Sequence, residues 1–199
     1  MDIDDLKQVN GLWKNIYPYL VSQIMEHYHN DSESVLELGP FSGGISRELA
    51  KLYPGISITI AEESPLVVNY LKKEVLALSS CEEIKIKETP LNHLIFNDFQ
   101  FELVVFRGAF FFLDKEGVIL REIFRILKKG GMAFVGGGYG KDTPEKFIRE
   151  IANESRLLND RLGRRRVSLR DMEEMLKKSK LTDTCRIEEE GGLWLIIRK

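Results

Sequence analysis

The sequence predicts an α/β fold in which a doubly wound, mostly parallel seven-stranded sheet is covered by helices on both faces. Short apolar segments alternate with amphipathic ones along most of the chain, and the apolar segments are nearly continuous. Continuous apolar strands are typical of a parallel sheet that is buried on both faces. The chain ends in two strand-like segments joined at Gly191-Gly192, which predicts an antiparallel hairpin.

Size and charge are typical of a compact domain. The 199 residues include 29 Lys and Arg and 31 Asp and Glu, which gives a formal net charge of −2, and 43% of the residues are hydrophobic. A disordered chain would have fewer apolar residues and a larger net charge, and a single domain has roughly 100–200 residues. The near-neutral charge argues against a basic coat for nucleic acids, although it leaves room for a local basic patch.

The cysteine content and the hydropathy pattern indicate in which cellular compartment the protein is expected. Cys81 and Cys185 are too few for a disulfide framework or a metal-ligand cluster. No apolar run approaches the roughly 20 residues of a membrane span, and the acidic start differs from a secretory signal. We therefore expect a reduced cytoplasmic protein with no metal and no membrane partner. The sequence gives no indication of the oligomeric state.

Each element is predicted from its periodicity and its flanking residues. Apolar residues at three- and four-residue steps predict helix over 5–29, with Pro18 beginning a second helical piece. Lys128 to Gly131 are expected to cap the C-terminus of the helix before them. The other expected helices cover 45–52, 65–79, 115–127 and 144–180. The expected strands cover 34–38, 56–61, 84–87, 101–106, 132–135, 182–189 and 193–198.

The chain is expected to divide into an N-terminal helical segment, 1–30, and a ligand-binding domain, 31–199. Within that domain, 136–180 is interpreted as a helical insertion that borders the ligand pocket. It begins with a glycine-rich stretch, which is expected to be a flexible loop because it lacks the pattern of a phosphate loop. Five arginines lie between Arg161 and Arg170, and we favour a solvated charged segment over an anion clamp or a nucleic-acid contact.

Candidate ligand-binding residues follow the first two strands. In an open parallel sheet the ligand crevice lies beyond the carboxyl ends of the strands, where the strand order reverses. Glycines between Glu37 and Gly44 would let the backbone turn sharply and approach a ligand, although a glycine turn that binds nothing is the alternative. Glu62 and Glu63 are placed to accept hydrogen bonds from ribose hydroxyls. Phe41 at the middle glycine position weakens a dinucleotide interpretation.

Three stretches resemble motifs of the class I S-adenosylmethionine-dependent methyltransferases. Val35 to Gly43 is similar to their first motif, and Phe101 to Phe110 to their fourth-strand motif. Ile126 to Gly131 is similar to their turn of leucine, a basic residue, proline and two glycines, with Lys129 in place of proline. The resemblance runs from about residue 30 to the C-terminus and implies a Rossmann-like fold.

The resemblance implies a methyltransferase that uses S-adenosylmethionine and releases S-adenosylhomocysteine. In this family the cofactor supplies the activated group and the protein mainly aligns the acceptor, so the sequence identifies no catalytic residue. The N-terminal segment would fold over the cofactor as a lid. The residues expected to bind the cofactor are Glu37, Gly39, Pro40, Phe41, Ser42, Gly43, Glu62, Glu63, Thr89, Pro90, Leu91, Arg107 and Gly108.

A small-molecule acceptor is the favoured interpretation, because little of the chain is left for binding a large one. Two alternatives stay open. One is a catalytically inactive binding or partner protein, motivated by Phe41 and Thr89, and the other is an RNA methyltransferase that uses the arginines between Arg161 and Arg170. The residues expected to line the acceptor pocket are Tyr17, Phe110, Tyr139 and Arg164.

Overall fold

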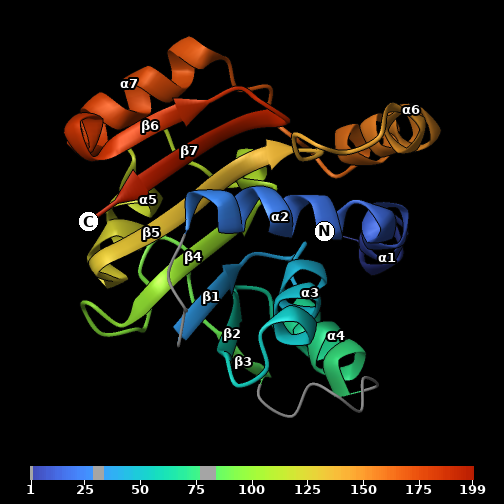
Figure 1. The fold of residues 1–199 in the computed structure, drawn as a ribbon, viewed down its shortest axis with the longest axis horizontal. Coiled ribbons are helices and arrows are strands. Elements are labelled where there is room, and N and C mark those ends of the chain that lie inside the picture. Colours follow the sequence, from blue (N-terminus) through green and yellow to red (C-terminus); the bar gives the residue numbers. More distant parts are fainter. Residues whose placement is uncertain (1, 29–33, 77–83) are drawn as a thin grey trace.

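The computed structural model describes residues 2–28, 34–76 and 84–199. Within these ranges one seven-stranded sheet has the order β3-β2-β1-β4-β5-β7-β6 (Figure 1). Strands β1 to β5 are parallel, β7 is antiparallel to β5, and β6 is antiparallel to β7, so the predicted sheet and its terminal hairpin are confirmed. The strands are β1 Ser34–Leu38, β2 Ser57–Glu62, β3 Ile84–Glu88, β4 Phe101–Arg107, β5 Leu127–Gly138, β6 Cys185–Glu188 and β7 Gly192–Arg198.

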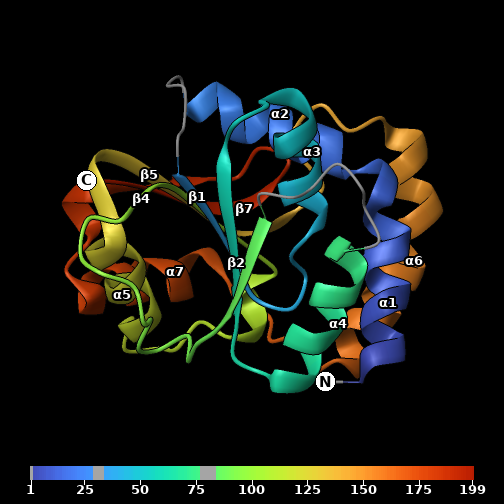
Figure 2. The ribbon, with the colours of Figure 1, turned by 90° about the horizontal axis from the view of Figure 1, so that it is seen from below.

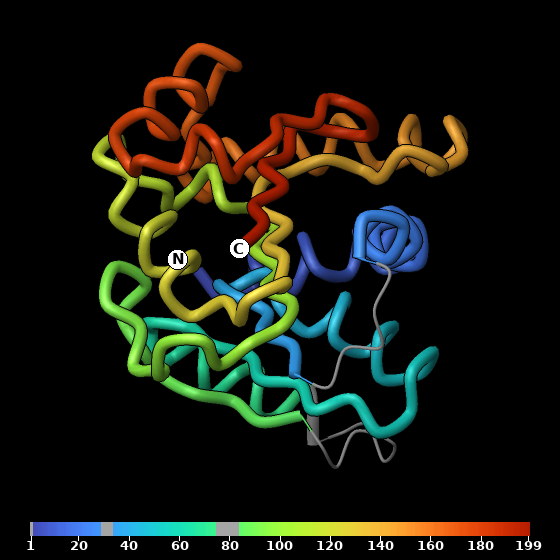
Figure 3. The backbone as a smooth tube through the Cα atoms, turned by 60° about the vertical axis from the view of Figure 1, so that its left-hand side comes forward, coloured from blue at the N-terminus to red at the C-terminus, as the bar shows by residue number. Residues whose placement is uncertain are grey.

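Alternate residues of the central strands belong to two separate hydrophobic clusters, because successive side chains of a strand point to opposite faces. One cluster holds Leu103 of β4 together with α1, α2, α3, α4 and α6, and the other holds Val104 together with α5 and α7. Figures 2 and 3 show α2 and α5 on opposite sides of the sheet. The helices are α1 Ile3–Leu12, α2 Tyr17–His27, α3 Gly44–Leu52, α4 Pro65–Leu76, α5 Val118–Ile126, α6 Glu145–Arg161 and α7 Leu169–Ser179.

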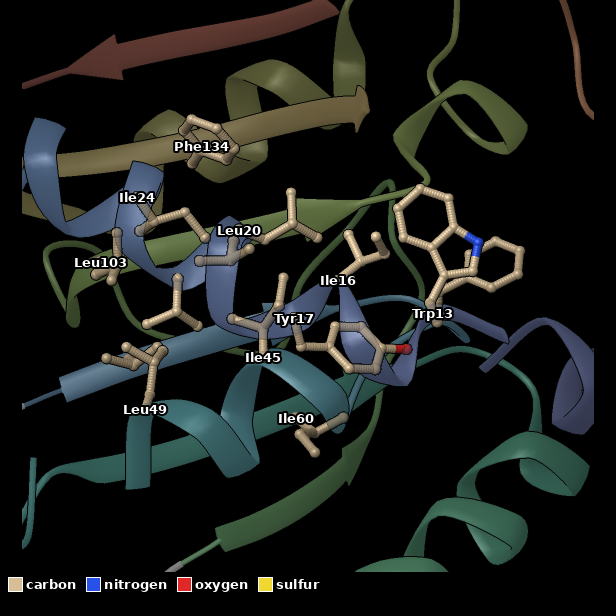
Figure 4. Packing of buried hydrophobic residues seen from close by; sticks show 14 of the residues in the cluster. Trp13, Ile16, Tyr17, Leu20, Ile24, Ile45, Leu49, Ile60, Leu103 and Phe134 are labelled. Atoms are coloured by element: carbon tan, nitrogen blue, oxygen red, sulfur yellow. The ribbon is translucent and has the colours of Figure 1, made fainter. Parts of the chain in front are cut away.

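The N-terminal segment forms two helices that pack on the sheet. A short 3-10 turn, Trp13–Asn15, separates α1 from α2, and Pro18 lies in the first turn of α2, where a missing N–H costs no helical hydrogen bond. The predicted division at Pro18 is confirmed. Leu20 of α2 packs in one cluster with Phe134 of β5 and Ile45 of α3 (Figure 4). This packing fixes α2 over the strands that bound the candidate site.

Two predictions around β5 are wrong. Helix α5 ends at Ile126 and β5 begins at the next residue, so Lys128 to Gly131 belong to the strand and do not cap a helix. The glycines at 136–138 also lie in β5, where Gly136 pairs with Trp194 of β7. A Cβ on Gly136 would lie 2.2 Å from the carbonyl oxygen of Leu193. Glycine at this position therefore allows β7 to approach β5 closely and does not make the segment a flexible loop.

Further differences concern the ends of elements. The helical stretch expected over 144–180 is divided into α6 and α7 by residues 162–168, and the sixth strand begins only at Cys185 because 182–184 form a 3-10 turn. Cys81 lies outside the described residues. In the described ranges no helix is both long and apolar enough to cross a membrane. The same ranges contain no cluster of three or more His, Cys, Asp or Glu side chains suited to a metal ion.

Candidate functional site

The strand order reverses between β1 and β4, so the carboxyl ends of these strands border the expected ligand crevice. The turn after β1 begins at Gly39 (φ +88°) and ends at Gly43 (φ +103°), both in the left-handed region that favours glycine. Helix α3 starts at the next residue, Gly44. The glycines therefore turn the chain directly from the strand into a helix at the crevice.

Glu37 holds this turn in place from the interior. Its side chain is 1% exposed, and its Oε2 accepts hydrogen bonds from the backbone N–H groups of Gly43 (2.9 Å) and Ser46 (3.0 Å) and from the Ser46 hydroxyl. Burial raises the pKa of Glu37, and the hydrogen bond from the Ser46 hydroxyl counters that rise. Its Oε1 is buried without a hydrogen-bond partner among the described residues. Glu37 thus ties the loop to α3 and still has one free acceptor.

Glu62 at the end of β2 presents a second buried carboxylate. Its Oε1 accepts a hydrogen bond from the backbone N–H of Ser64 at 3.1 Å, whereas its Oε2 is buried without a partner among the described residues. Burial raises the pKa of Glu62 to about 7. A buried acceptor without a donor is costly, which points to a ligand that supplies the donor. The neighbouring Glu63 is exposed, so the structure separates the two glutamates and buries Glu62, the one that the family resemblance matched to the ribose.

The loop after β3 uses its own polar groups internally. The backbone N–H of Thr89 donates to the Glu62 carbonyl at 3.0 Å, and its Oγ1 accepts from the backbone N–H of Ile95 at 3.0 Å. Leu91 is buried in the hydrophobic cluster that contains α5 and α7, and Pro90 is exposed. Thr89 therefore joins β3 to the end of β2, and its N–H is not free for a ligand.

Phe41, at the position where the resembled motif has glycine, is 1% exposed. Its ring lies 4.9 Å from that of Phe111 and covers Gly108, where an added Cβ would approach the Phe41 ring to 2.5 Å. Gly108 also has a left-handed φ of +70°. Phe41 and Gly108 are thus matched, since the ring fills a space that only glycine leaves open.

Replacing Gly108 with alanine is expected to destabilise the protein by about 2–4 kcal/mol, because a Cβ would strain the backbone and collide with Phe41. Urea unfolding of the wild type, Gly108→Ala, Phe41→Leu and the double variant measures the coupling between the two positions. We expect the double variant to be more stable than the sum of the single effects predicts, by about 1 kcal/mol or more. Strict additivity would contradict the matched packing.

Arg107 is the last residue of β4, at the edge of the site, and is 4% exposed. One of its NH2 groups donates to the Phe41 carbonyl (2.9 Å), Asn10 Oδ1 (3.2 Å) and the Tyr17 hydroxyl (3.2 Å). The guanidinium also lies 4.8 Å from the centre of the Trp13 ring. Its Nε is buried without a partner among the described residues. Asn10 and Trp13 were not predicted as site residues, because nothing in a helical repeat marks which side chains reach a distant strand.

Arg107 lines a cavity of about 250 Å³, called here the aromatic cavity, at the carboxyl ends of β4 and β5. The predicted residues Phe110, Tyr139 and Arg164 line this cavity, as do Phe41 and Gly108. The sequence interpretation missed Trp13, Phe111, Gly137, Ser155, Arg156 and Asn159, which also line it. Ser155 and Asn159 are four residues apart and so share a face of α6, a signal that helical periodicity could have supplied.

Tyr17, the fourth predicted pocket residue, instead lines a second cavity of about 330 Å³ beside the glycine turn. Asn10, Ser42, Gly43 and Arg47 also line this space, called here the helical cavity. Asn10 and Tyr17 are hydrogen-bond partners of Arg107, which lines the aromatic cavity. The Arg107 side chain and these two partners therefore separate the two cavities.

The fold and the two buried carboxylates define a class of protein that binds a nucleoside-containing ligand at the carboxyl edge of a parallel sheet. A family model described as "Methyltransferase domain" matches residues 36–135 of this chain. The chain belongs to this family and is an S-adenosylmethionine-dependent methyltransferase of class I. No curated protein sequence matches the chain.

Solved structures show the same fold. A protein from Methanococcus maripaludis, assigned as an S-adenosyl-L-methionine-dependent methyltransferase, gives a TM-score of 0.79 at 24% identity, covering 98% of this chain and 91% of that one. A SAM-dependent methyltransferase from Aquifex aeolicus gives 0.68 at 15% identity, covering 99% of both chains. PigF with SAH gives 0.67 at 18% identity, covering 91% of this chain and 55% of PigF.

The described residues fit this cofactor. Glu62 offers a buried carboxylate oxygen without a partner to the hydroxyl donors of a ribose, and Glu37 offers another beside the glycine turn. When bound, S-adenosylmethionine supplies a methyl group already activated for transfer. Glu62 would hold the ribose, and the glycine turn would hold the methionine portion.

Affinity for S-adenosylhomocysteine is expected to fall as the pH falls through 7. Burial raises the pKa of Glu62 to about 7, and only the ionised carboxylate can accept from both ribose hydroxyls. Below pH 7 the free protein holds a proton that it must release on binding, so affinity at pH 6 is about tenfold weaker than at pH 8. Calorimetry across this range measures the effect. The Glu62→Gln variant should give a flat profile, and a flat profile in the wild type would contradict the assignment.

Proposed function

We propose that the chain methylates a small molecule bound in the aromatic cavity. The observation that carries this proposal is the position of the cavity, which is lined by Gly108 after β4, by Gly137 of β5 and by Phe41 of the glycine turn. A space of about 250 Å³ admits a small acceptor and excludes a large one. A cytoplasmic location belongs to the same proposal and rests on the low cysteine content.

The N-terminal segment, residues 1–30, acts in this proposal as the cover of the site. Trp13 Nε1 donates to the Ser155 hydroxyl at 3.2 Å, and the Trp13 ring stacks on Tyr139 at 5.1 Å between centroids. Asp5 forms an ion pair with Arg161 at 3.0 Å. These contacts join α1 and its following turn to α6 and the end of β5. The enclosure they form would keep water away from the transfer and hold the acceptor in line.

The aromatic cavity contains no evident general base. In the described part of the chain its lining includes no carboxylate, lysine or histidine side chain. Burial raises the pKa of the Tyr139 hydroxyl, which keeps this group protonated near neutral pH. The acceptor would therefore have to present a nucleophilic atom that needs no protein side chain to deprotonate it.

The structure offers little support for the two alternative functions. Phe41 and Thr89, the two residues that depart from the family motifs and suggested an inactive protein, both have structural partners. Phe41 packs on Gly108, and Thr89 accepts a hydrogen bond from the backbone N–H of Ile95. In the arginine segment, Arg161 pairs with Asp5, Arg164 with Asp160 and Arg170 with Glu174. Arg165 donates to the carbonyl of Leu113. Pairing with groups of the chain itself supports the interpretation of a charged surface segment over an RNA contact, with Arg164 set apart because it also lines the aromatic cavity.

The test has two steps on the full chain. Calorimetric titration should show micromolar or tighter binding of S-adenosylhomocysteine. Transfer of radiolabelled methyl groups is then measured against a panel of small phenols, thiols, amines and carboxylates, with a mixed RNA as the competing acceptor. Label in a small molecule and none in RNA is the expected result. Label recovered only in RNA would overturn the proposal.

A further inference from the structure

The aromatic cavity has a one-sided charge. Three arginines line it, Arg107, Arg164 and the exposed Arg156, whereas no acidic side chain of the described residues does. Arg164 pairs with Asp160 at 3.4 Å, which lies outside the lining, and its side chain is 29% exposed. Arg107 and Arg156 form no ion pair with a described residue within 4.0 Å. The lining therefore has an excess of positive charge, although the buried Glu37 carboxylate outside the lining interacts electrostatically with Arg107.

Arg107 is the strongest sign that this charge awaits a ligand. Burying a guanidinium is costly unless an anion or a full set of acceptors compensates for the loss of water. Only one end of the Arg107 side chain finds acceptors, namely the Phe41 carbonyl, Asn10 and Tyr17, and its Nε has none. A negative group in the cavity would supply the missing acceptor.

The walls indicate the shape of this ligand. Trp13 and Tyr139 stack with an angle of 7° between their planes, and Phe110 and Phe111 line the same space. Gly137 and Gly108 contribute backbone without side chains. Flat rings beside bare backbone leave a space suited to a planar ring, and arginine stacks on aromatic faces while it pairs with an anion.

We propose that the acceptor is a planar aromatic anion, with its ring among these side chains and its negative group against Arg107 and Arg164. This inference rests on the proposed function. During transfer a lone pair of the acceptor would form the bond to the methyl carbon, while the sulfur–methyl bond breaks and its electron pair stays on sulfur. An anion arrives without the proton that a neutral phenol or acid must lose, which agrees with a cavity that contains no base.

Benzoate and benzamide test the inference, because they share a shape and differ in charge. Each is titrated into protein saturated with S-adenosylhomocysteine. We expect benzoate to bind at least about tenfold more tightly than benzamide, and Arg164→Gln to reduce that preference. Arg170→Gln is the matched control, because Arg170 is exposed on α7 and pairs with Glu174. It should leave both affinities unchanged.

Several outcomes would overturn the inference. One is equal affinity for the two probes, or no binding of either at 10 mM. Another is loss of benzoate binding on saturation with S-adenosylhomocysteine, which would mean that the probe mimics the carboxylate of the cofactor. A third is that Arg47→Gln weakens the binding of benzoate whereas Arg164→Gln does not. That result would place the anion in the helical cavity. Methylation of neutral aromatic acceptors alone would refute this inference and leave the proposed function intact, whereas failure to bind S-adenosylhomocysteine would refute the function.

Discussion

Replacing Glu62 with glutamine is expected to stabilise the ligand-free protein while it weakens the binding of S-adenosylhomocysteine by about tenfold or more. At pH 8 the wild-type side chain is charged although it is 2% exposed, and its Oε2 has no partner among the described residues. Removing that charge should add about 1–2 kcal/mol to the free energy of unfolding. The same change removes a charged acceptor for the ribose, which is worth about 1.5–3 kcal/mol of binding.

The sign of the stability effect follows from the raised pKa. Burial raises the pKa of Glu62 to about 7, so the folded state holds its proton more tightly than the unfolded state. Stability from this group is present in full at low pH and decreases as the pH rises from about 4.5 to about 7. The gain from Glu62→Gln should therefore appear at pH 8 and vanish near pH 5, as measured by thermal unfolding.

Glu63→Gln is the discriminating comparison, because Glu63 is adjacent in sequence and exposed. We expect this variant to bind S-adenosylhomocysteine within about twofold of the wild type. If Glu63→Gln lost affinity and Glu62→Gln kept it, the exposed Glu63 would bind the ribose, and the assignment of Glu62 to that role would be wrong.

Replacing Glu37 with alanine is expected to destabilise the protein by about 2–4 kcal/mol and to abolish measurable cofactor binding. The carboxylate accepts three hydrogen bonds, from the Gly43 N–H, the Ser46 N–H and the Ser46 hydroxyl, and the change leaves these buried donors without an acceptor. Each buried donor left unpaired costs about 1–3 kcal/mol, partly offset because a buried charge is also removed. The glycine turn would then lose the group that holds it against α3.

Urea unfolding and calorimetry measure the two effects separately. Glu37→Gln keeps one oxygen acceptor, so it should lose less stability than Glu37→Ala. Lys51 is exposed on α3, the helix to which Glu37 bonds, so Lys51→Ala controls for a general effect on that helix. Unchanged affinity for S-adenosylhomocysteine in a folded Glu37→Ala variant would show that the turn does not depend on this carboxylate.

The parts of the fold that the sequence predicted are those with local causes. Strand and helix alternation follows from residue periodicity, the break at Pro18 from a missing N–H, and the hairpin from a Gly-Gly pair. The carboxylates after β1 and β2 could also be predicted, because parallel strands bring their carboxyl ends to one edge of the sheet. What the sequence could not tell is which of Glu62 and Glu63 is buried.

The errors at β5 have a non-local cause. Lys128 to Gly131 were predicted to cap a helix, and the glycines at 136–138 were predicted to form a loop, from their residue types alone. The structure puts both in one strand, and at Gly136 β7 approaches β5 so closely that a side chain would meet the Leu193 carbonyl. A partner strand more than 50 residues further along the chain therefore decides the conformation of these glycines.

By itself the sequence determined the order of elements, the glycine turn and the acidic residues at its edge, since these depend on neighbours a few positions apart. Only the tertiary structure decided how the aromatic cavity is closed and which distant side chains meet around it. Arg107 meets Asn10 and Tyr17 between the two cavities, and Trp13 meets Ser155 across 142 positions of sequence. Such pairs form because α1 and α6 close over the same strand ends. In the buried environment that results, each hydrogen bond is stronger than in water and each unpaired polar group is costly.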